Sequence, residues 1–109
     1  MSVWDTLADA IQNKKQVLAT YDGLHREMCP HVLGYKDGQA SCLFCQFGGE
    51  SSRGIIPLSD PQAYLNWRCL HLDKLENVSL RDGPWFSISR HTKAQTCVET
   101  VVAEVAGWV

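Results

Sequence analysis

Apolar residues recur every three or four positions at the start of the chain. Val3, Leu7 and Ile11 would lie on one side of a helix. Ser2 stands just before them, and serine is a residue type that caps helix N-termini. The pattern predicts a helix over about residues 2 to 13.

The pattern then changes to the two-residue alternation of β-strands. The pairs Asp22-Gly23 and Asp37-Gly38 are typical of tight hairpin turns. Pro30 cannot donate a ladder hydrogen bond, so we expect it to interrupt its strand. The predicted strands cover about residues 16–21, 24–29, 32–35 and 40–47.

The second half of the chain begins with a polar, glycine-rich stretch that predicts an irregular segment over about residues 48–62. Alternating residues then predict two strands, near 67–72 and 78–80. Thr92 with Gln95, and Thr96 with Glu99, have the spacing of capping boxes. They precede an apolar stripe at helical spacing, so the pattern predicts a C-terminal helix over about residues 93–106: Val98, Val101, Val102 and Val105.

Strands joined by tight turns pair antiparallel, and about five short strands in a small chain favour a strongly bent sheet or a barrel. We therefore expect a mainly β (α+β) fold: a small antiparallel barrel with an N-terminal and a C-terminal helix. Its 109 residues fit a single domain over 1–109. The expected core includes the following side chains: Leu43, Phe47, Leu70, Leu72 and Val78.

Composition excludes several classes of protein. Apolar residues make up 45% and charged residues 20%, which is typical of a folded globular domain. The formal net charge of −2 provides no broad basic surface, so any nucleic-acid site must be local. The start of the chain lacks the pattern of a secretory signal, and no apolar run reaches the roughly 20 residues of a membrane span. We expect a cytoplasmic protein with no membrane partner.

Five cysteines are an odd number, so they cannot form a complete set of disulfides within one chain. In the cytoplasm we expect them to stay reduced. Cys42 and Cys45 would point to opposite faces of one strand, which prevents them from sharing a metal ion or a disulfide. We expect no metal, no cofactor and no catalytic residue. A tetrahedral zinc site is kept as an alternative, with these candidate ligands: Cys29, His31, Cys69 and His71.

Two stretches of the chain match the outline of a known family. They are AIQNKKQVLATYDGLHREMCPHVLGYKDGQASCLFCQF and, later, WRCLHLDKLENVSLRDGPW. Between about residues 10 and 86 they resemble the WYL domain, with a strand ending in Tyr21, a strand leading to Pro30, a hairpin, and a closing segment that starts at Arg68. In the triplet that names the family only Leu43 remains, because Ser41 and Cys42 replace the aromatic pair.

The resemblance is to short, free-standing WYL-like proteins without a helix-turn-helix reader. It implies an Sm-like or SH3-like barrel that senses a ligand and passes the result to a regulatory partner, without catalysis. The implied ligand is a nucleic-acid fragment, such as a short single strand, or a nucleotide-like anion. Basic and aromatic residues near the matched motifs are the candidate ligand-binding residues: Arg68, His71, Lys74, Arg26, His31 and Tyr21.

Two further points stay open at the level of the sequence. Arg68 and His71 are three positions apart, so a regular strand would point them to opposite faces. Both can contact one ligand only if the strand twists or ends there. A structural or protein-interaction domain, which uses the barrel edge or the C-terminal helix to bind another protein or a second copy, is the alternative function, as is a small zinc-binding protein.

Overall fold

The computed structural model describes residues 2–50, 54–55, 57–87 and 97–105. Its elements follow in chain order: α1 (Val3–Asn13), β1 (Gln16–Tyr21), β2 (Leu24–Lys36), β3 (Gln39–Gly49), a 3-10 helix (Ala63–Asn66), β4 (Trp67–His71), a second 3-10 helix (Leu72–Lys74), β5 (Glu76–Arg81) and β6 (Thr100–Glu104). The predicted first helix and the strands predicted near 16–21, 40–47, 67–72 and 78–80 are confirmed, with shifts at their ends.

Helix α1 begins and ends as its sequence predicts. The Ser2 Oγ accepts a hydrogen bond from the Asp5 amide at 3.1 Å, which satisfies one of the free N–H groups of the first turn. Lys14 ends the helix in the left-handed conformation, with φ of 51°. The apolar side of the helix, including Leu7 and Ile11, is buried against the sheet.

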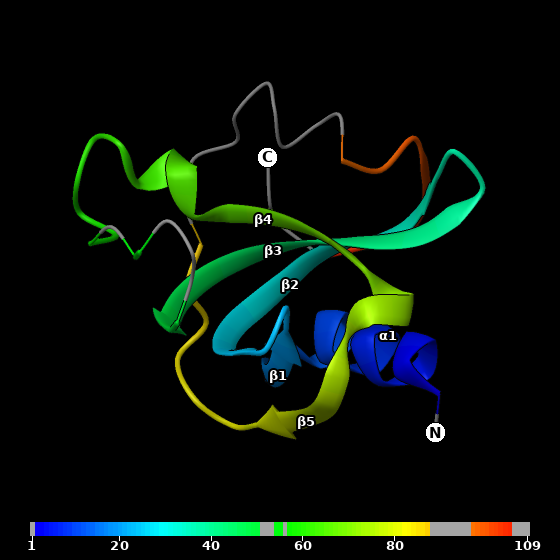
Figure 1. Cartoon of the computed structure of the whole chain (residues 1–109), viewed down its shortest axis with the longest axis horizontal. Coiled ribbons are helices and arrows are strands. Elements are labelled where there is room, and N and C mark those ends of the chain that lie inside the picture. The colour runs from blue at the N-terminus through cyan, green and yellow to red at the C-terminus, as the bar shows by residue number, and fades with distance from the viewer. Residues whose placement is uncertain (1, 51–53, 56, 88–96, 106–109) are drawn as a thin grey trace.

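The sheet is antiparallel and follows the strand order β4-β3-β2-β1-β5. β2 is its long central strand and pairs with β3 on one side (Figure 1). On its other side, the first part of β2 pairs with β1 and the last part pairs with β6. β6 therefore extends the sheet beyond the end of β1.

Pro30 does not interrupt its strand, which corrects our expectation. β2 runs through Pro30, and the pairing with β3 shifts register between Pro30 and Val32. A register shift accommodates a residue without an N–H because the ladder is already irregular there. The strands predicted at 24–29 and 32–35 are thus one strand.

The predicted C-terminal helix is wrong where the structure describes it. Residues 93–96 and 106 lie outside the described residues, and the described part contains strand β6 instead of a helix. β-branched side chains such as Val101 and Val102 favour extended backbone, and pairing with β2 supplies the hydrogen bonds. This local preference outweighs the helical spacing of the valines.

The closed barrel is not found either. Among the described residues, the outermost strands of the main path, β4 and β5, are not paired with each other. They are nevertheless joined by only the short 3-10 helix Leu72–Lys74. Because two opposite edges are linked by so few residues, the sheet has to bend strongly, and it does so around α1 (Figure 1).

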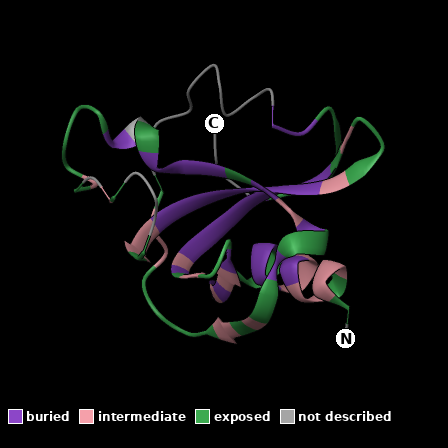
Figure 2. Ribbon diagram, viewed as in Figure 1, coloured by how far each residue is buried: buried purple, intermediate pink, exposed green. Residues whose placement is uncertain are grey.

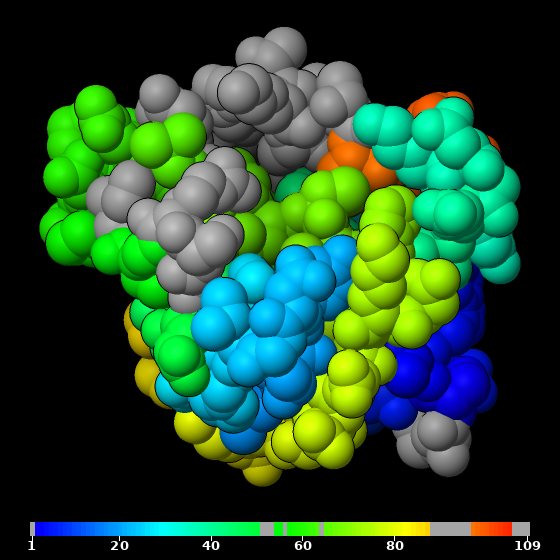
Figure 3. Space-filling view, in the orientation of Figure 1, coloured from blue at the N-terminus to red at the C-terminus, as the bar shows by residue number. Residues whose placement is uncertain are grey.

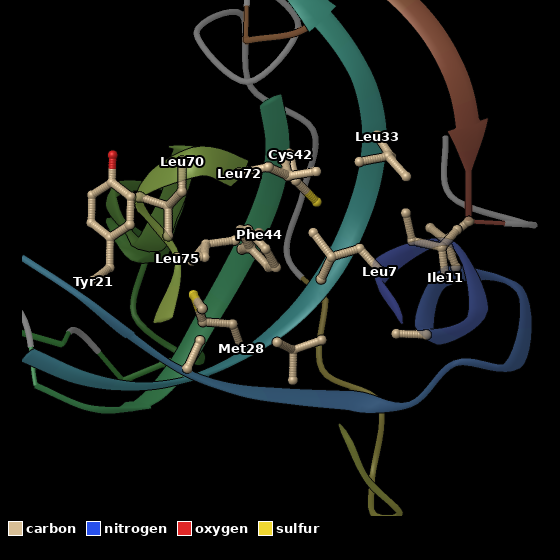
Figure 4. Packing of buried hydrophobic residues seen from close by; sticks show 14 residues of the cluster. Leu7, Ile11, Tyr21, Met28, Leu33, Cys42, Phe44, Leu70, Leu72 and Leu75 are labelled. Atoms are coloured by element: carbon tan, nitrogen blue, oxygen red, sulfur yellow. The ribbon is translucent and has the colours of Figure 1, made fainter. Parts of the chain in front are cut away.

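The core forms on both faces of the central strands, which are buried along most of their length (Figure 2). On one face, side chains from the strands and α1 meet around Phe44 (Figure 4). On the other, Leu43, Cys45 and Trp67 pack with Val98. Of the predicted core, three leucines are buried and two residues are only half-buried: Leu43, Leu70 and Leu72, against Phe47 and Val78.

Within the described residues, no helix combines the length and the apolar character that crossing a bilayer would require.

Candidate anion-binding site

The structure brings three of the six predicted ligand-binding residues together. Tyr21 ends β1, Arg26 lies near the start of β2, and Arg68 lies near the start of β4. All three lie at one end of the sheet, around the Gln46 side chain of β3. We call these four residues the arginine–glutamine cluster.

Gln46 organises the cluster. Its Oε1 accepts hydrogen bonds from Arg26 Nη1 at 3.4 Å and from Arg68 Nε at 3.2 Å. Its Nε2 donates to the carbonyls of Gly48 at 3.0 Å and Glu50 at 2.8 Å. The side chain is fully buried, and every polar atom of its amide has a partner. Gln46 thus fixes the two guanidinium groups relative to the end of β3.

Arg26 is a buried cation with neutral partners. It is 5% exposed, and its Nε donates to the Tyr21 carbonyl at 3.4 Å. Its guanidinium carbon lies 5.3 Å from the centre of the Tyr21 ring, within cation–π range. Among the described residues, Arg26 has no carboxylate partner. A buried charge without a counter-charge is costly, which makes Arg26 the first candidate for contact with an anion.

Arg68 is buried on the same side of the sheet. It is 3% exposed and donates through Nη1 to the Leu65 carbonyl and through Nη2 to the Gly54 carbonyl at 3.1 Å. These bonds hold Arg68 between the residues before β4 and the loop after β3. In the space-filling view of Figure 3, the start of β2 (light blue) lies beside the end of β3 (green). Arg26 pairs with Gly49 where these two strands meet.

His31 lies apart from the cluster, in an aromatic environment. It is fully buried, its ring meets the Trp67 ring edge-on at 4.9 Å, and the Trp85 ring lies 5.1 Å away. Nδ1 lies 2.9 Å from the Cys29 carbonyl, and Nε2 lies 2.9 Å from Ser87 Oγ. A carbonyl only accepts, so Nδ1 carries the proton and Nε2 accepts from the serine. Burial lowers the pKa of His31 to about 4, so the ring is neutral at pH 7.

The other two predicted residues, His71 and Lys74, also lie away from the cluster. Arg68 pairs with Phe44 in the ladder, whereas His71 pairs with Ser41 at the opposite end of β4. The His71 Nδ1 lies 3.2 Å from Ser41 Oγ. Lys74 is exposed on the 3-10 helix that follows. The three-residue spacing along a regular strand separates His71 from Arg68, and Lys74 lies beyond the end of β4.

The cysteines differ from our expectation in one respect. Cys69 and Cys97 form a disulfide across 28 residues, with Cα atoms 5.6 Å apart, so not all thiols are reduced. An odd number of cysteines still allows one such pair. Cys97 lies just before β6, and this part of the chain passes next to Cys69 of β4. The opposite faces predicted for Cys42 and Cys45 are confirmed, since they belong to different core clusters.

The three remaining thiols are buried. Burial raises the pKa of Cys29 to about 11 and the pKa of Cys45 to about 12, and raises that of Cys42 well above its usual value. Such thiols remain protonated at neutral pH and react slowly as nucleophiles.

The four residues considered for zinc do not form a site. Cys69 is bonded to Cys97 and is therefore no thiolate ligand. His31 lies between Trp67 and Trp85, whereas His71 lies beside Ser41. Throughout the described part of the chain, no three histidine, cysteine or acidic residues are placed to hold a metal ion.

Gln46 was missed by sequence reasoning, although its position provides a signal. It is a polar residue inside the apolar run Cys42–Phe47, where the predicted strand is buried on both faces. Buried polar side chains need partners, and an amide can accept from two donors at once. A lone glutamine in such a run therefore indicates a buried polar network.

We expect Gln46→Leu to lower the free energy of unfolding by about 2 to 3 kcal/mol, because hydrogen bonds to charged groups contribute about 1.5 to 3 kcal/mol. The leucine has a similar size but leaves both guanidinium groups without this acceptor. Urea denaturation measures the loss. Gln39→Leu is the matched control, since Gln39 is exposed on the same strand. Equal stability of both variants would contradict the role assigned to Gln46.

Comparison with known proteins gives no match to a family model, a curated protein or a solved structure.

Proposed function

We propose that this chain is a non-catalytic ligand-binding module of the WYL type, which binds a phosphate-bearing ligand at the arginine–glutamine cluster. The ligand class is a nucleotide or a short single-stranded nucleic acid. The observation that carries the proposal is the buried Arg26 guanidinium, whose partners among the described residues are all neutral.

The topology supports the fold that the WYL resemblance implies. The two outer strands of the path β4-β3-β2-β1-β5 are consecutive in sequence and are joined by the 3-10 helix Leu72–Lys74. A sheet with this connection has to curl until its two edges approach each other, which is the requirement for a small barrel. The Sm-like or SH3-like barrel thus remains our proposal for the complete fold.

The chemistry of the cluster supports an anionic ligand. A guanidinium presents paired N–H donors that match two phosphate oxygens, and it stays charged at any physiological pH. Arg26 and Arg68 are held by one acceptor, so their charges are close together although the net charge of the chain is −2. The Tyr21 ring supports Arg26 from one side, and we assign it a positioning role instead of stacking on a base.

Both guanidinium groups are buried, so a ligand has to displace some of the protein atoms that cover them. The Glu50 amide donates to the His25 carbonyl at 2.6 Å and closes the end of β3 onto β2 beside Arg26. This bond lies outside the ladder between β2 and β3, so the ladder stays intact when the bond opens. We infer that binding is accompanied by movement at this end of the sheet.

The test compares binding of adenosine diphosphate and of a short oligothymidine to three proteins: the parent, Arg26→Gln and Arg81→Gln. Arg81 is the matched control because it is an exposed arginine, paired with Glu27 at 2.7 Å. We expect Arg26→Gln to weaken binding about tenfold to a hundredfold, the equivalent of one charge-assisted contact. Arg81→Gln should bind like the parent.

Calorimetric titration at low salt measures these affinities, and circular dichroism verifies that each variant is folded. Binding should weaken as salt is added, because phosphate contacts depend on ionic strength. If the parent binds neither ligand, the proposed function is wrong. If Arg26→Gln binds as tightly as the parent, the ligand site is not at the cluster.

A second candidate function, self-association through β6, is favoured by one observation. Val101 is 52% exposed and Val102 is 56% exposed on a strand that pairs, among the described residues, only with β2. Exposed edge strands with apolar side chains are sites for pairing with another chain. A homodimer formed by β6 pairing with its counterpart would satisfy the free backbone edge and place these valines next to the side chains of the second copy.

Light scattering after size exclusion distinguishes a dimer from a monomer. If the chain is a dimer, we expect Val101→Lys to shift it to the monomer, because a charge at the edge opposes pairing. Leu65→Lys is the control, since Leu65 is an apolar residue with 37% exposure outside β6. A parent that is monomeric at high concentration would rule out this function.

A further inference from the structure

The Cys69–Cys97 disulfide connects an edge strand to the segment that carries β6. Cys69 lies on β4, whereas Cys97 begins the described segment 97–105. The two cysteines differ in access: Cys69 is exposed, and Cys97 is 3% exposed. A thiolate from solution can therefore approach the sulfur of Cys69, with the sulfur of Cys97 as the leaving group.

Besides the disulfide, the segment packs against α1 and contributes to both core clusters, Cys97 and Val98 to one and Val105 to the other. Its buried side chains are Cys97, Val98 and Val105, and most of β6 is exposed. β6 contacts the sheet along one edge, through its pairing with β2 and the hydrogen bonds from Glu99 N to Tyr35 O at 2.9 Å and from Val105 N to His31 O at 2.8 Å. Strands with many exposed residues are the first to open locally.

The attachment over β2 requires close contact at Gly34. A Cβ at this position would overlap the Thr100 carbonyl oxygen and would lie 2.5 Å from a methyl carbon of Val98. Segment 97–105 therefore lies directly on the backbone of β2. If the segment leaves, the edge of β2 from Val32 to Tyr35 loses its partner. The backbone pairing along the path β4-β3-β2-β1-β5 does not use that edge.

We propose that the Cys69–Cys97 disulfide is a thiol–disulfide exchange site for a dithiol reductant, and that its reduction releases segment 97–105 from β2 while the other strands stay folded. A reductant thiolate attacks the Cys69 sulfur, the bond between the two sulfurs breaks, and Cys97 leaves as a thiolate that takes a proton from water. The second thiol of the reductant then attacks the mixed disulfide and releases Cys69. Two electrons pass to the protein, which gains two thiols, and the reductant becomes a disulfide.

The other cysteines do not interfere with this exchange. Cys29, Cys42 and Cys45 are buried and protonated at neutral pH, so they react slowly as nucleophiles. The reaction is therefore confined to the pair that anchors the segment. This inference is independent of the proposed phosphate ligand, because the arginine–glutamine cluster contains no residue of the pair.

Hydrogen exchange with mass spectrometry tests the proposal on the full chain, before and after treatment with dithiothreitol. On reduction we expect amides in 98–105 and 32–35 to exchange at least about tenfold faster, as in local opening, with amides of 17–21 and 41–45 unchanged. Faster exchange everywhere would show global unfolding and overturn the proposal. No change, or a chain that forms no disulfide even in oxidised glutathione, would overturn it as well.

Two variants and one adduct sharpen the test. Cys69→Ser combined with Cys97→Ser should show the fast exchange without reductant and should not respond to dithiothreitol. Gly34→Ala should show it with the disulfide intact, because the methyl group displaces the segment. A monothiol, glutathione, should give an adduct on Cys69, and an adduct on Cys97 instead would contradict the assigned direction of attack.

Discussion

Phe44→Ala is expected to lower the free energy of unfolding by about 3 to 5 kcal/mol, the range for a buried phenylalanine reduced to alanine. Phe44 is fully buried at the centre of the cluster that joins the strands to α1 (Figure 4). Its removal leaves a cavity that Leu7 and Met28, which are equally buried, can fill only by leaving their own contacts. Such a loss is a large part of the stability of a small domain.

Urea denaturation of the parent and the variant measures this loss. Phe47→Ala is the matched control, because it removes the same side chain from the same strand at a half-buried position beside Phe86. We expect it to cost less than half as much as Phe44→Ala, since the change in buried area is smaller. If the two variants were equally stable, the assignment of the core to this face would be wrong.

Local signals in the sequence predicted the first part of the fold well. Asp22-Gly23 and Asp37-Gly38 form the expected hairpin turns, and both aspartates adopt positive φ, which tight turns require. The α1 cap at Ser2 is likewise a local interaction. Signals of this kind depend on a few neighbouring residues, so they can be interpreted without knowing the rest of the fold.

The errors arose where distant residues decide the structure. Whether Val101 and Val102 form a helix or a strand depends on the free edge of β2, which lies far away in sequence. The same return of the chain places Cys97 beside Cys69, and spacing along the sequence cannot indicate that pairing. The closure of a barrel also depends on how far the sheet bends, which hairpin signals do not specify.

Only part of the candidate site could be predicted, because some of its residues are brought together by a local turn and others by the pairing of distant strands. Tyr21 and Arg26 flank one hairpin, so their proximity follows from a local turn. Arg68 joins them through the pairing of β3 with β4, which the order of strands suggested only in outline. His31 belongs to another environment because the register shift after Pro30 places it between two tryptophans.

The environment of His31 leads to an expected loss of stability in acid. The unfolded chain takes up a proton on this histidine near pH 6.5, whereas the folded chain does so only near pH 4, because burial opposes the charged ring. Between these values the unfolded state binds more protons, so stability falls as the pH falls through this window. The contribution of neutral His31 to the free energy of unfolding is complete above pH 6.5, and about 3 kcal/mol of this free energy is lost by pH 4.

Denaturation curves at a series of pH values between 7 and 4 measure this effect, and His31→Gln separates it from the titration of carboxylates. The variant should be less stable than the parent at pH 7, because it loses the imidazole contacts with Trp67 and Trp85. Its stability should also fall less steeply below pH 6.5, since it has no ring to protonate at this position. Parallel pH profiles for the parent and His31→Gln would show that this histidine is protonated as readily in the folded chain as in the unfolded one.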